Sequence, residues 1–160
     1  MQKLNRKSLL CSILGTVALF LFSAIHATPE APAKIFGFQP GDDYKLASYE
    51  QMENYYKQLA SQSDRVQLRE IGKSVLGRSL YLLTISSKEN LSNLEKYRSI
   101  SEQLARSRID TDTAEILANE GKAVVWIDGG LHSTELAHGQ MTPLLAHRVA
   151  TEESNEMRQI

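Results

Sequence analysis

Two side chains that can bind a metal, His132 and Glu135, lie three residues apart in the segment 123–141 (AVVWIDGGLHSTELAHGQM). This spacing lets an imidazole nitrogen and a carboxylate oxygen converge on one point. Zinc accepts both ligand types, and a catalytic zinc typically takes three protein ligands and a water molecule. The metal lowers the pKa of that water toward ~7 and polarises a substrate carbonyl. We therefore predict that His132 and Glu135 are two ligands of a catalytic Zn²⁺ ion.

The pair also has a simpler interpretation, because i,i+3 contacts are common on solvated helix surfaces. The sequence around His132 and Glu135 favours metal binding over this simpler interpretation. The pair follows a short β-branched and aromatic run at 123–128 and a turn at Gly129–Gly130, and residues 133–134 (Ser-Thr) suit a helix start. In open α/β sheets, ligands bind near the carboxyl ends of strands. A strand, a tight turn and a helix would thus place the pair at a favourable position.

Three nearby polar residues have weaker claims to the site. His138 follows Glu135 by three residues, but ligands at i and i+6 of one helix point in different directions. We therefore predict that His138 packs near the site or supports a ligand, and that His147 lies on the helix surface. Asp128 is either a hydrogen-bond acceptor for the histidine ligand or a turn residue at a strand end.

Three other residues are expected to be structural. Trp126 and Tyr81 lie within strand patterns and are predicted to be core residues. Arg78 is predicted to belong to a turn, with a substrate contact as the alternative.

Helical and strand patterns alternate along the chain. Ser48 and Gln51 form a capping box that opens a helix to about Ser61. Further expected elements are strands at 66–71 and 79–86 paired across a turn at 72–77, a helix at 91–106, a helix from Asp112 and Glu115 to Gly121, a central strand at 123–128 and a helix at 134–152. This order predicts an α/β domain with helices packed on a sheet.

The first residues have the pattern of a secretory signal peptide. Lys3, Arg6 and Lys7 precede an apolar run at 9–25, and a small residue, Ala27, comes before a polar, proline-bearing stretch. We expect cleavage near Ala27, with Ala24 as a second candidate, and a secreted or periplasmic protein. An uncleaved membrane anchor is the alternative, because the run approaches the ~20 residues that span a bilayer.

The composition argues against disulfide bonds in the mature chain and against nucleic acid as a partner. The only cysteine, Cys11, lies in the signal segment, so the mature chain would have no disulfide. A net charge of −1 and the absence of a basic stripe argue against nucleic acid as a partner. After signal cleavage we expect no membrane association. Residues 28–43 would form an extended leader, and residues 44–160 the domain.

The segment DGGLHSTELAHGQ resembles the first zinc motif of the carboxypeptidase A-like zinc carboxypeptidases, in which His-x-x-Glu supplies two of three ligands. The stretch from Ser48 to Ser86 is similar to the opening helix and first two strands of that family. It includes a G-x-S-x-x-G-R turn, which spans Gly72 to Arg78 in this chain. The resemblance covers about residues 44–160.

This resemblance implies an α/β/α sandwich around a mixed eight-stranded sheet, of which the chain would hold the N-terminal part. It also implies hydrolysis of C-terminal residues from peptides or proteins by a zinc-activated water. The third ligand, a histidine, and the general-base glutamate are expected beyond Ile160, so no catalytic residue is assigned within the chain. The domain is accordingly expected to be incomplete.

Two other functions stay open. The 160-residue chain would be an inactive truncated remnant, or a metal-binding fragment without peptidase activity, if it acquires no further ligand. It would be a membrane-tethered binding module if the N-terminal segment is retained. The coding sequence after Ile160 distinguishes the first of these from the enzyme.

Overall fold

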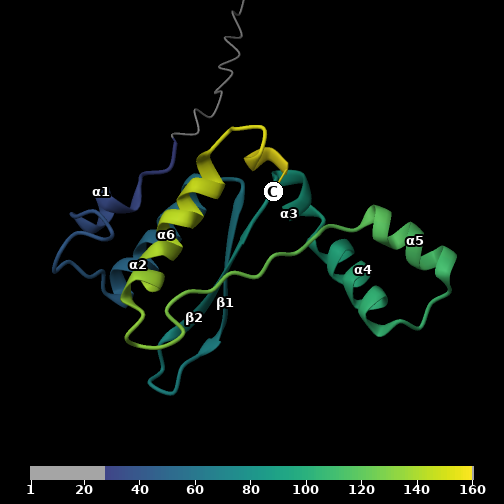
Figure 1. Cartoon of the computed structure of the whole chain (residues 1–160), viewed down its shortest axis with the longest axis horizontal. Coiled ribbons are helices and arrows are strands. Elements are labelled where there is room, and N and C mark those ends of the chain that lie inside the picture. Colours follow the sequence, from purple (N-terminus) through teal and green to yellow (C-terminus); the bar gives the residue numbers. More distant parts are fainter. Residues whose placement is uncertain (1–27, 160) are drawn as a thin grey trace, which may run out of the picture.

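The computed structural model describes residues 28–159, which form seven helical segments and one hairpin (Figure 1). In chain order the elements are α1 (Pro32–Phe36), α2 (Tyr49–Gln62), β1 (Val66–Lys73), β2 (Ser79–Ile85), α3 (Lys88–Ser92), α4 (Leu94–Arg106), α5 (Thr111–Glu120), α6 (Leu136–Thr151) and the 3₁₀ turn η1 (Met157–Gln159). Helices combined with a two-stranded antiparallel sheet are consistent with the predicted incomplete α/β domain.

Helix α2 begins as its capping box predicts. The Ser48 hydroxyl accepts from the Gln51 N–H at 3.2 Å, and the Gln51 side chain accepts from the Ser48 N–H at 2.9 Å. These two bonds satisfy donors that the first turn of a helix leaves free. The side chains of Tyr55 and Leu59, on one face of α2, are fully buried.

The predicted hairpin is confirmed. Strands β1 and β2 pair antiparallel, with Val66 opposite Ile85 and Leu68 opposite Leu83, and a bulge falls between Glu70 and Gly72. Successive side chains alternate between the two faces of a sheet. The face with Leu83 and Ile85 therefore turns toward the helices and packs against the core.

The core lies between this face and three helices. Helices α2 and α6 lie side by side over the hairpin, with α1 against them (Figure 1). Its buried residues come from all these parts of the chain: Phe36, Ala47, Tyr55, Leu59, Val66, Ala146 and Ala150. Because α6 follows the His132–Glu135 pair directly, this core fixes the element that carries the candidate site.

Polar contacts add to the anchoring of α6. The Tyr56 hydroxyl donates to Thr142 Oγ1 at 2.8 Å, since the Thr142 hydroxyl proton is already donated to Gly139 O. That carbonyl would otherwise lack a partner, because Pro143 inside the helix has no N–H. Buried Gln140 accepts from the Ala47 N–H at 3.2 Å. Helix α6 is thus tied both to α2 and to the segment that precedes α2.

The segment 28–43 is not extended as predicted. Its residues 32–36 form α1, where Pro32 starts the helix and Gly37 ends it with φ of +78°. Proline at the first helical position and a left-handed glycine at the end are favourable for a short helix. Burial of Pro32 and Phe36 against the core holds this turn in place.

Helices α4 and α5 pack on each other as a hairpin set apart from the core (Figure 1). The single helix predicted at 91–106 is broken at Asn93 into α3 and α4. The N-cap of α5 is Asp110 instead of the predicted Asp112, because its carboxylate accepts from both the N–H and the hydroxyl of Thr113. Gly121 ends α5 as expected.

The central strand predicted at 123–128 is wrong for the described residues. Residues 122–130 are irregular and belong to neither strand. No backbone hydrogen bond joins them to another segment between residues 28 and 159. A β-branched run becomes a strand only where a neighbouring strand takes its backbone groups. Here β2 pairs only with β1.

The predicted signal peptide at 1–27 lies outside the described residues. Between residues 28 and 159, none of the helices combines the length and apolar character needed to cross a membrane.

Candidate metal site

Two glycines bring the turn before His132 directly onto helix α6. A Cβ on Gly129 would lie 2.6 Å from His138 O and 2.9 Å from Thr142 Cγ2. Gly130 has φ of +74°, a left-handed conformation that favours glycine. The ideal Cβ position of Gly130 is 3.2 Å from the Cα of Gly139. The backbone of the turn can therefore approach the helix more closely than any side chain would permit.

His132 and Glu135 meet at the start of that helix. Their Nδ1 and Oε1 atoms are 2.7 Å apart, and the His132 N–H donates to Glu135 Oε2 at 3.4 Å. The Glu135 N–H in turn donates to His132 O at 3.0 Å. The predicted pair is therefore brought together as expected, by a turn at 132–135 and not by successive turns of one helix.

The helix start itself differs from the prediction. Ser133 and Thr134 do not cap α6, and its N-cap is Glu135, whose side chain makes no capping bond. The carboxylate instead turns back to His132. A residue that would ordinarily neutralise the helix N-terminus is thus directed at the imidazole.

His138 approaches the same carboxylate from the first turn of α6. Its Nδ1 lies 3.6 Å from Glu135 Oε2, an ion-pair distance longer than a normal hydrogen bond. We predicted that His138 packs near the site or supports a ligand, and the structure places it near the site. The argument that His132 and His138 point in different directions from one helix was incomplete. His132 precedes α6, so the i,i+6 geometry does not apply to this pair.

The Glu135 carboxylate is well suited to bind a cation. The hydrogen bond from the His132 side chain, followed by that from the His132 backbone, lowers the pKa of Glu135 below its usual range. The carboxylate is therefore ionised at neutral pH and can only accept, so His132 Nδ1 carries the donated proton. The His132 side chain is 73% exposed and that of Glu135 32%, which leaves the pair accessible to an ion from solution.

A complete metal site is not formed by the described residues. Between residues 28 and 159, no group of three His, Cys, Asp or Glu side chains is arranged to hold a metal. His132 and Glu135 offer two donors to a zinc ion that usually takes three from the protein.

The remaining candidates have structural contacts. Asp128 accepts from Trp126 Nε1 at 3.3 Å and makes no bond to His132. Trp126 is 69% exposed, so its predicted place in the core is wrong. Its segment lacks the neighbouring strand and the opposing layer that would cover it. His147 Nε2 donates to Pro29 O at 3.0 Å and thereby holds the N-terminal segment on α6.

Arg78 belongs to the hairpin turn, as predicted. Its N–H donates to Ser74 Oγ at 3.1 Å. Its guanidinium lies 2.8 Å from Glu50 and over the ring of Tyr49, 5.5 Å from the ring centroid. These contacts fasten the turn to α2.

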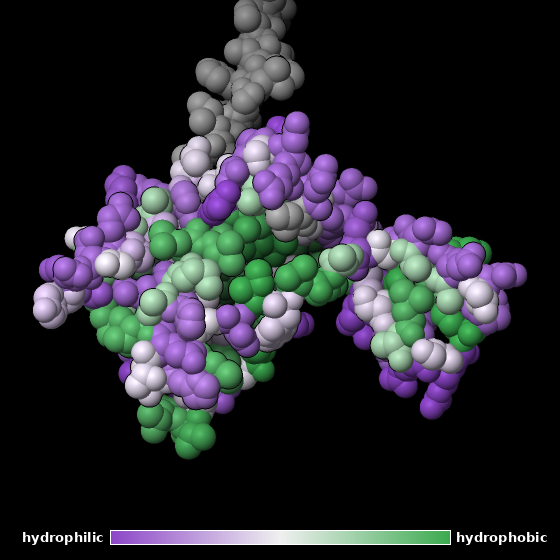
Figure 2. Space-filling model, in the orientation of Figure 1, coloured by the Kyte–Doolittle hydropathy of each residue, from purple (hydrophilic) through white to green (hydrophobic). Residues whose placement is uncertain are grey.

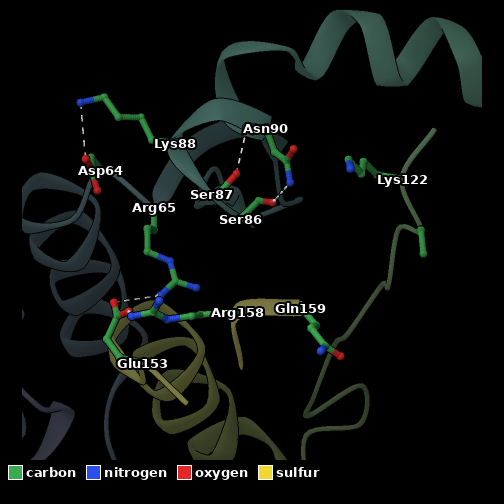
Figure 3. Close-up of a pocket in the computed structure, with 11 residues that line it drawn as sticks. Asp64, Arg65, Ser86, Ser87, Lys88, Asn90, Lys122, Glu153, Arg158 and Gln159 are labelled. Atoms are coloured by element: carbon green, nitrogen blue, oxygen red, sulfur yellow. Dashed lines mark hydrogen bonds and ion pairs between the residues drawn. The ribbon is translucent and has the colours of Figure 1, made fainter. Parts of the chain in front are cut away.

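A pocket of about 510 Å³ lies elsewhere in the molecule and was not predicted (Figure 3). Figure 3 shows that its charged side chains largely pair with one another. Glu153 lies 3.6 Å from Arg65 and 2.9 Å from Arg158, and Lys88 lies 3.5 Å from Asp64. Neither His132 nor Glu135 lines the pocket, so it is separate from the candidate site.

The sequence was also compared with models of known protein families. A sequence model described as zinc carboxypeptidase matches residues 52–160. The match begins within α2, continues through the hairpin and includes the turn that carries His132 and Glu135. Searches of curated proteins and of solved structures each gave no significant match.

Proposed function

The chain belongs to the zinc carboxypeptidase family, and we propose that His132 and Glu135 are two protein ligands of its Zn²⁺. The function we propose for the domain is the hydrolysis of C-terminal residues from peptides or proteins. The observation that carries this proposal is the convergence of His132 Nδ1 and Glu135 Oε1 at 2.7 Å on an accessible surface.

The donor atoms fit a zinc ion after a small adjustment. Two ligands at about 2.1 Å from a tetrahedral zinc lie roughly 3.4 Å apart. His132 Nδ1 and Glu135 Oε1 would need to separate by roughly 0.7 Å from their hydrogen-bonded distance. Both side chains are exposed enough to make that movement by rotation.

In this proposal the residues of the chain prepare the metal position. To bind a metal through Nδ1, His132 would have to lose to solvent the proton that Nδ1 donates to Glu135 and carry its ring proton on Nε2 instead, so that the imidazole stays neutral. The ionised Glu135 offsets part of the metal's charge. When bound, zinc supplies an activated water and polarises the scissile carbonyl. The third ligand and the general base are not assigned to any residue between 28 and 159.

A second candidate function is metal binding without peptidase activity. It is favoured by one observation, the absence of a three-ligand group between residues 28 and 159. For the 160-residue chain we expect weak zinc binding and no release of C-terminal amino acids.

We also propose that the protein is exported. Support comes from the charged and apolar pattern of residues 1–27. N-terminal sequencing of protein recovered from outside the cytoplasm should begin at or close to Thr28. Recovery of the protein only in membranes, with Met1 intact, would support the anchor instead.

The metal assignment is tested with the 160-residue chain and three variants. Zinc is added while the imidazole signals are followed by NMR, which resolves each of the 4 histidines even when binding is weak. We expect His132→Ala and Glu135→Ala to abolish saturable binding. His147→Ala is the matched control, because His147 is a histidine of helix α6 that contacts Pro29 and makes no contact with His132 or Glu135.

Catalysis is tested separately with the longest polypeptide that the gene encodes. Release of free C-terminal amino acids from a peptide should depend on zinc, stop on chelation, and be lost in His132→Ala and Glu135→Ala. Turnover that persists with all metal removed would contradict the proposal.

A further inference from the structure

We propose that His138 is a positioning residue for Glu135, holding the second carboxylate oxygen so that the first can face a metal. The inference rests on the proposed function, because it assigns a role to His138 relative to the proposed ligand. It differs from a ligand role, since His138 would act through Glu135 and not on the ion.

The two oxygens of Glu135 have different neighbours. Oε1 takes the hydrogen bond from His132 Nδ1 at 2.7 Å, whereas Oε2 lies 3.4 Å from the His132 N–H and 3.6 Å from His138 Nδ1. A metal held by Nδ1 and Oε1 would replace the hydrogen bond between these two atoms. The contacts that remain to orient the carboxylate are those of Oε2.

His138 is well placed to keep such a contact. It lies in the first turn of α6, and its carbonyl oxygen is 2.6 Å from the ideal Cβ position of Gly129. The close turn therefore limits movement of the His138 backbone toward Gly129. Between residues 28 and 159, only the side chains of His132 and His138 lie within ion-pair or hydrogen-bond distance of the Glu135 carboxylate.

The chemistry of an imidazole N–H suits this role. A ligating carboxylate is commonly held by a hydrogen-bond donor outside the metal's own ligand set, and loss of such a donor typically lowers metal affinity 10–100-fold. The His138 side chain is 67% exposed, so solvent competes with its contact. We therefore expect an effect near the lower end, about tenfold.

Zinc titrations of the full 160-residue chain, followed by imidazole NMR, test the inference. Zinc alone is the probe, and wild type is compared with His138→Ala, His138→Asn and the control His147→Ala. His138→Ala should raise the Kd about tenfold. His138→Asn should restore most of the affinity, because the Asn amide N–H lies near the position of imidazole Nδ1. Far-UV circular dichroism verifies that the total helix content is retained in each variant.

Three results would overturn the inference. A Kd of His138→Ala equal to that of wild type would show that the contact has no role. A loss as complete as in His132→Ala, without rescue by Asn, would make His138 a ligand. An equal loss in His147→Ala would show that α6 is merely perturbed. The proposed function fails on a different result, namely unchanged zinc affinity in His132→Ala and Glu135→Ala.

Discussion

At the scale of single residues, the candidate site contains two glycines with different surroundings, Gly129 in the turn and Gly139 in helix α6. Gly129 faces the backbone of α6 so closely that an ideal Cβ would lie 2.6 Å from His138 O. An ideal Cβ on Gly139 would meet nothing within 4 Å. The two positions thus have opposite steric requirements, although Gly139 also lies beside the turn, with its Cα 3.2 Å from the ideal Cβ position of Gly130.

This asymmetry gives a paired prediction. Gly129→Ala should destabilise the fold by about 1–3 kcal/mol, as is typical of overpacking, because backbone atoms must move. It should also weaken zinc binding, because the displaced turn carries His132. Gly139→Ala should instead stabilise the fold by about 0.5–1 kcal/mol through helix propensity. Chemical denaturation of both variants measures the difference, and equal effects would contradict the close contact.

The proximity of the proposed metal ligands is the part of the site that the sequence could predict. His132 and Glu135 converge as their residue types and spacing indicated. The sequence could not show that Glu135 is also the helix N-cap, because the capping signal of Ser133 and Thr134 is locally stronger. The fixed place of His138 depends on the contact between Gly129 and α6, which is set by packing and has no local pattern.

At the scale of elements, helix α5 depends on one titratable cap. The pKa of Asp110 is lowered, first by the hydrogen bond from the Thr113 N–H and then by that from its hydroxyl. A carboxyl with a lower pKa in the folded state stabilises that state above its unfolded pKa. This stabilisation is lost as the pH falls through the folded value.

We therefore expect α5 to lose amide-exchange protection as the pH is lowered below about 4, the usual range of an aspartate. Asp110→Asn should be less protected than wild type at neutral pH but independent of pH in this window, because its amide oxygen still accepts from the Thr113 N–H. Asp110→Ala should be poorly protected at every pH. A wild-type helix with unchanged protection down to pH 2 would contradict the cap assignment.

Elements whose stability is local were predicted well. Helix α2 could be predicted from its own capping box, and the hairpin from the alternating pattern of its two strands. The run at 123–128 was predicted wrongly, because the strand state requires a neighbour and between residues 28 and 159 none pairs with it. Short segments such as α1 escaped prediction because burial of Pro32 and Phe36 stabilises them.

At the scale of the whole molecule, the segment 124–127 leaves apolar side chains in solvent. Val124, Val125 and Trp126 are 79%, 75% and 69% exposed, and Ile127 is 56% exposed. Figure 2 shows hydrophobic residues in the middle of the surface, across the space between the helical core and the α4–α5 hairpin. Contiguous apolar surface of this kind favours association, more so beside unpaired extended backbone.

We predict that the 160-residue chain self-associates in a concentration-dependent manner through this segment. Val125→Lys should shift sedimentation toward the monomer, because a charge opposes burial of the segment. Val75→Lys is the matched control, since Val75 is 104% exposed at the hairpin turn, outside the segment. Equal effects of both substitutions would assign the change to net charge alone.

Zinc titration followed by imidazole NMR tests most directly whether His132 and Glu135 form a metal-binding pair. The predicted result is saturable movement of the His132 signals, absent in Glu135→Ala and intact in His147→Ala. Movement of His147 with His132 unaffected, or wild-type zinc binding in Glu135→Ala, would contradict the claim.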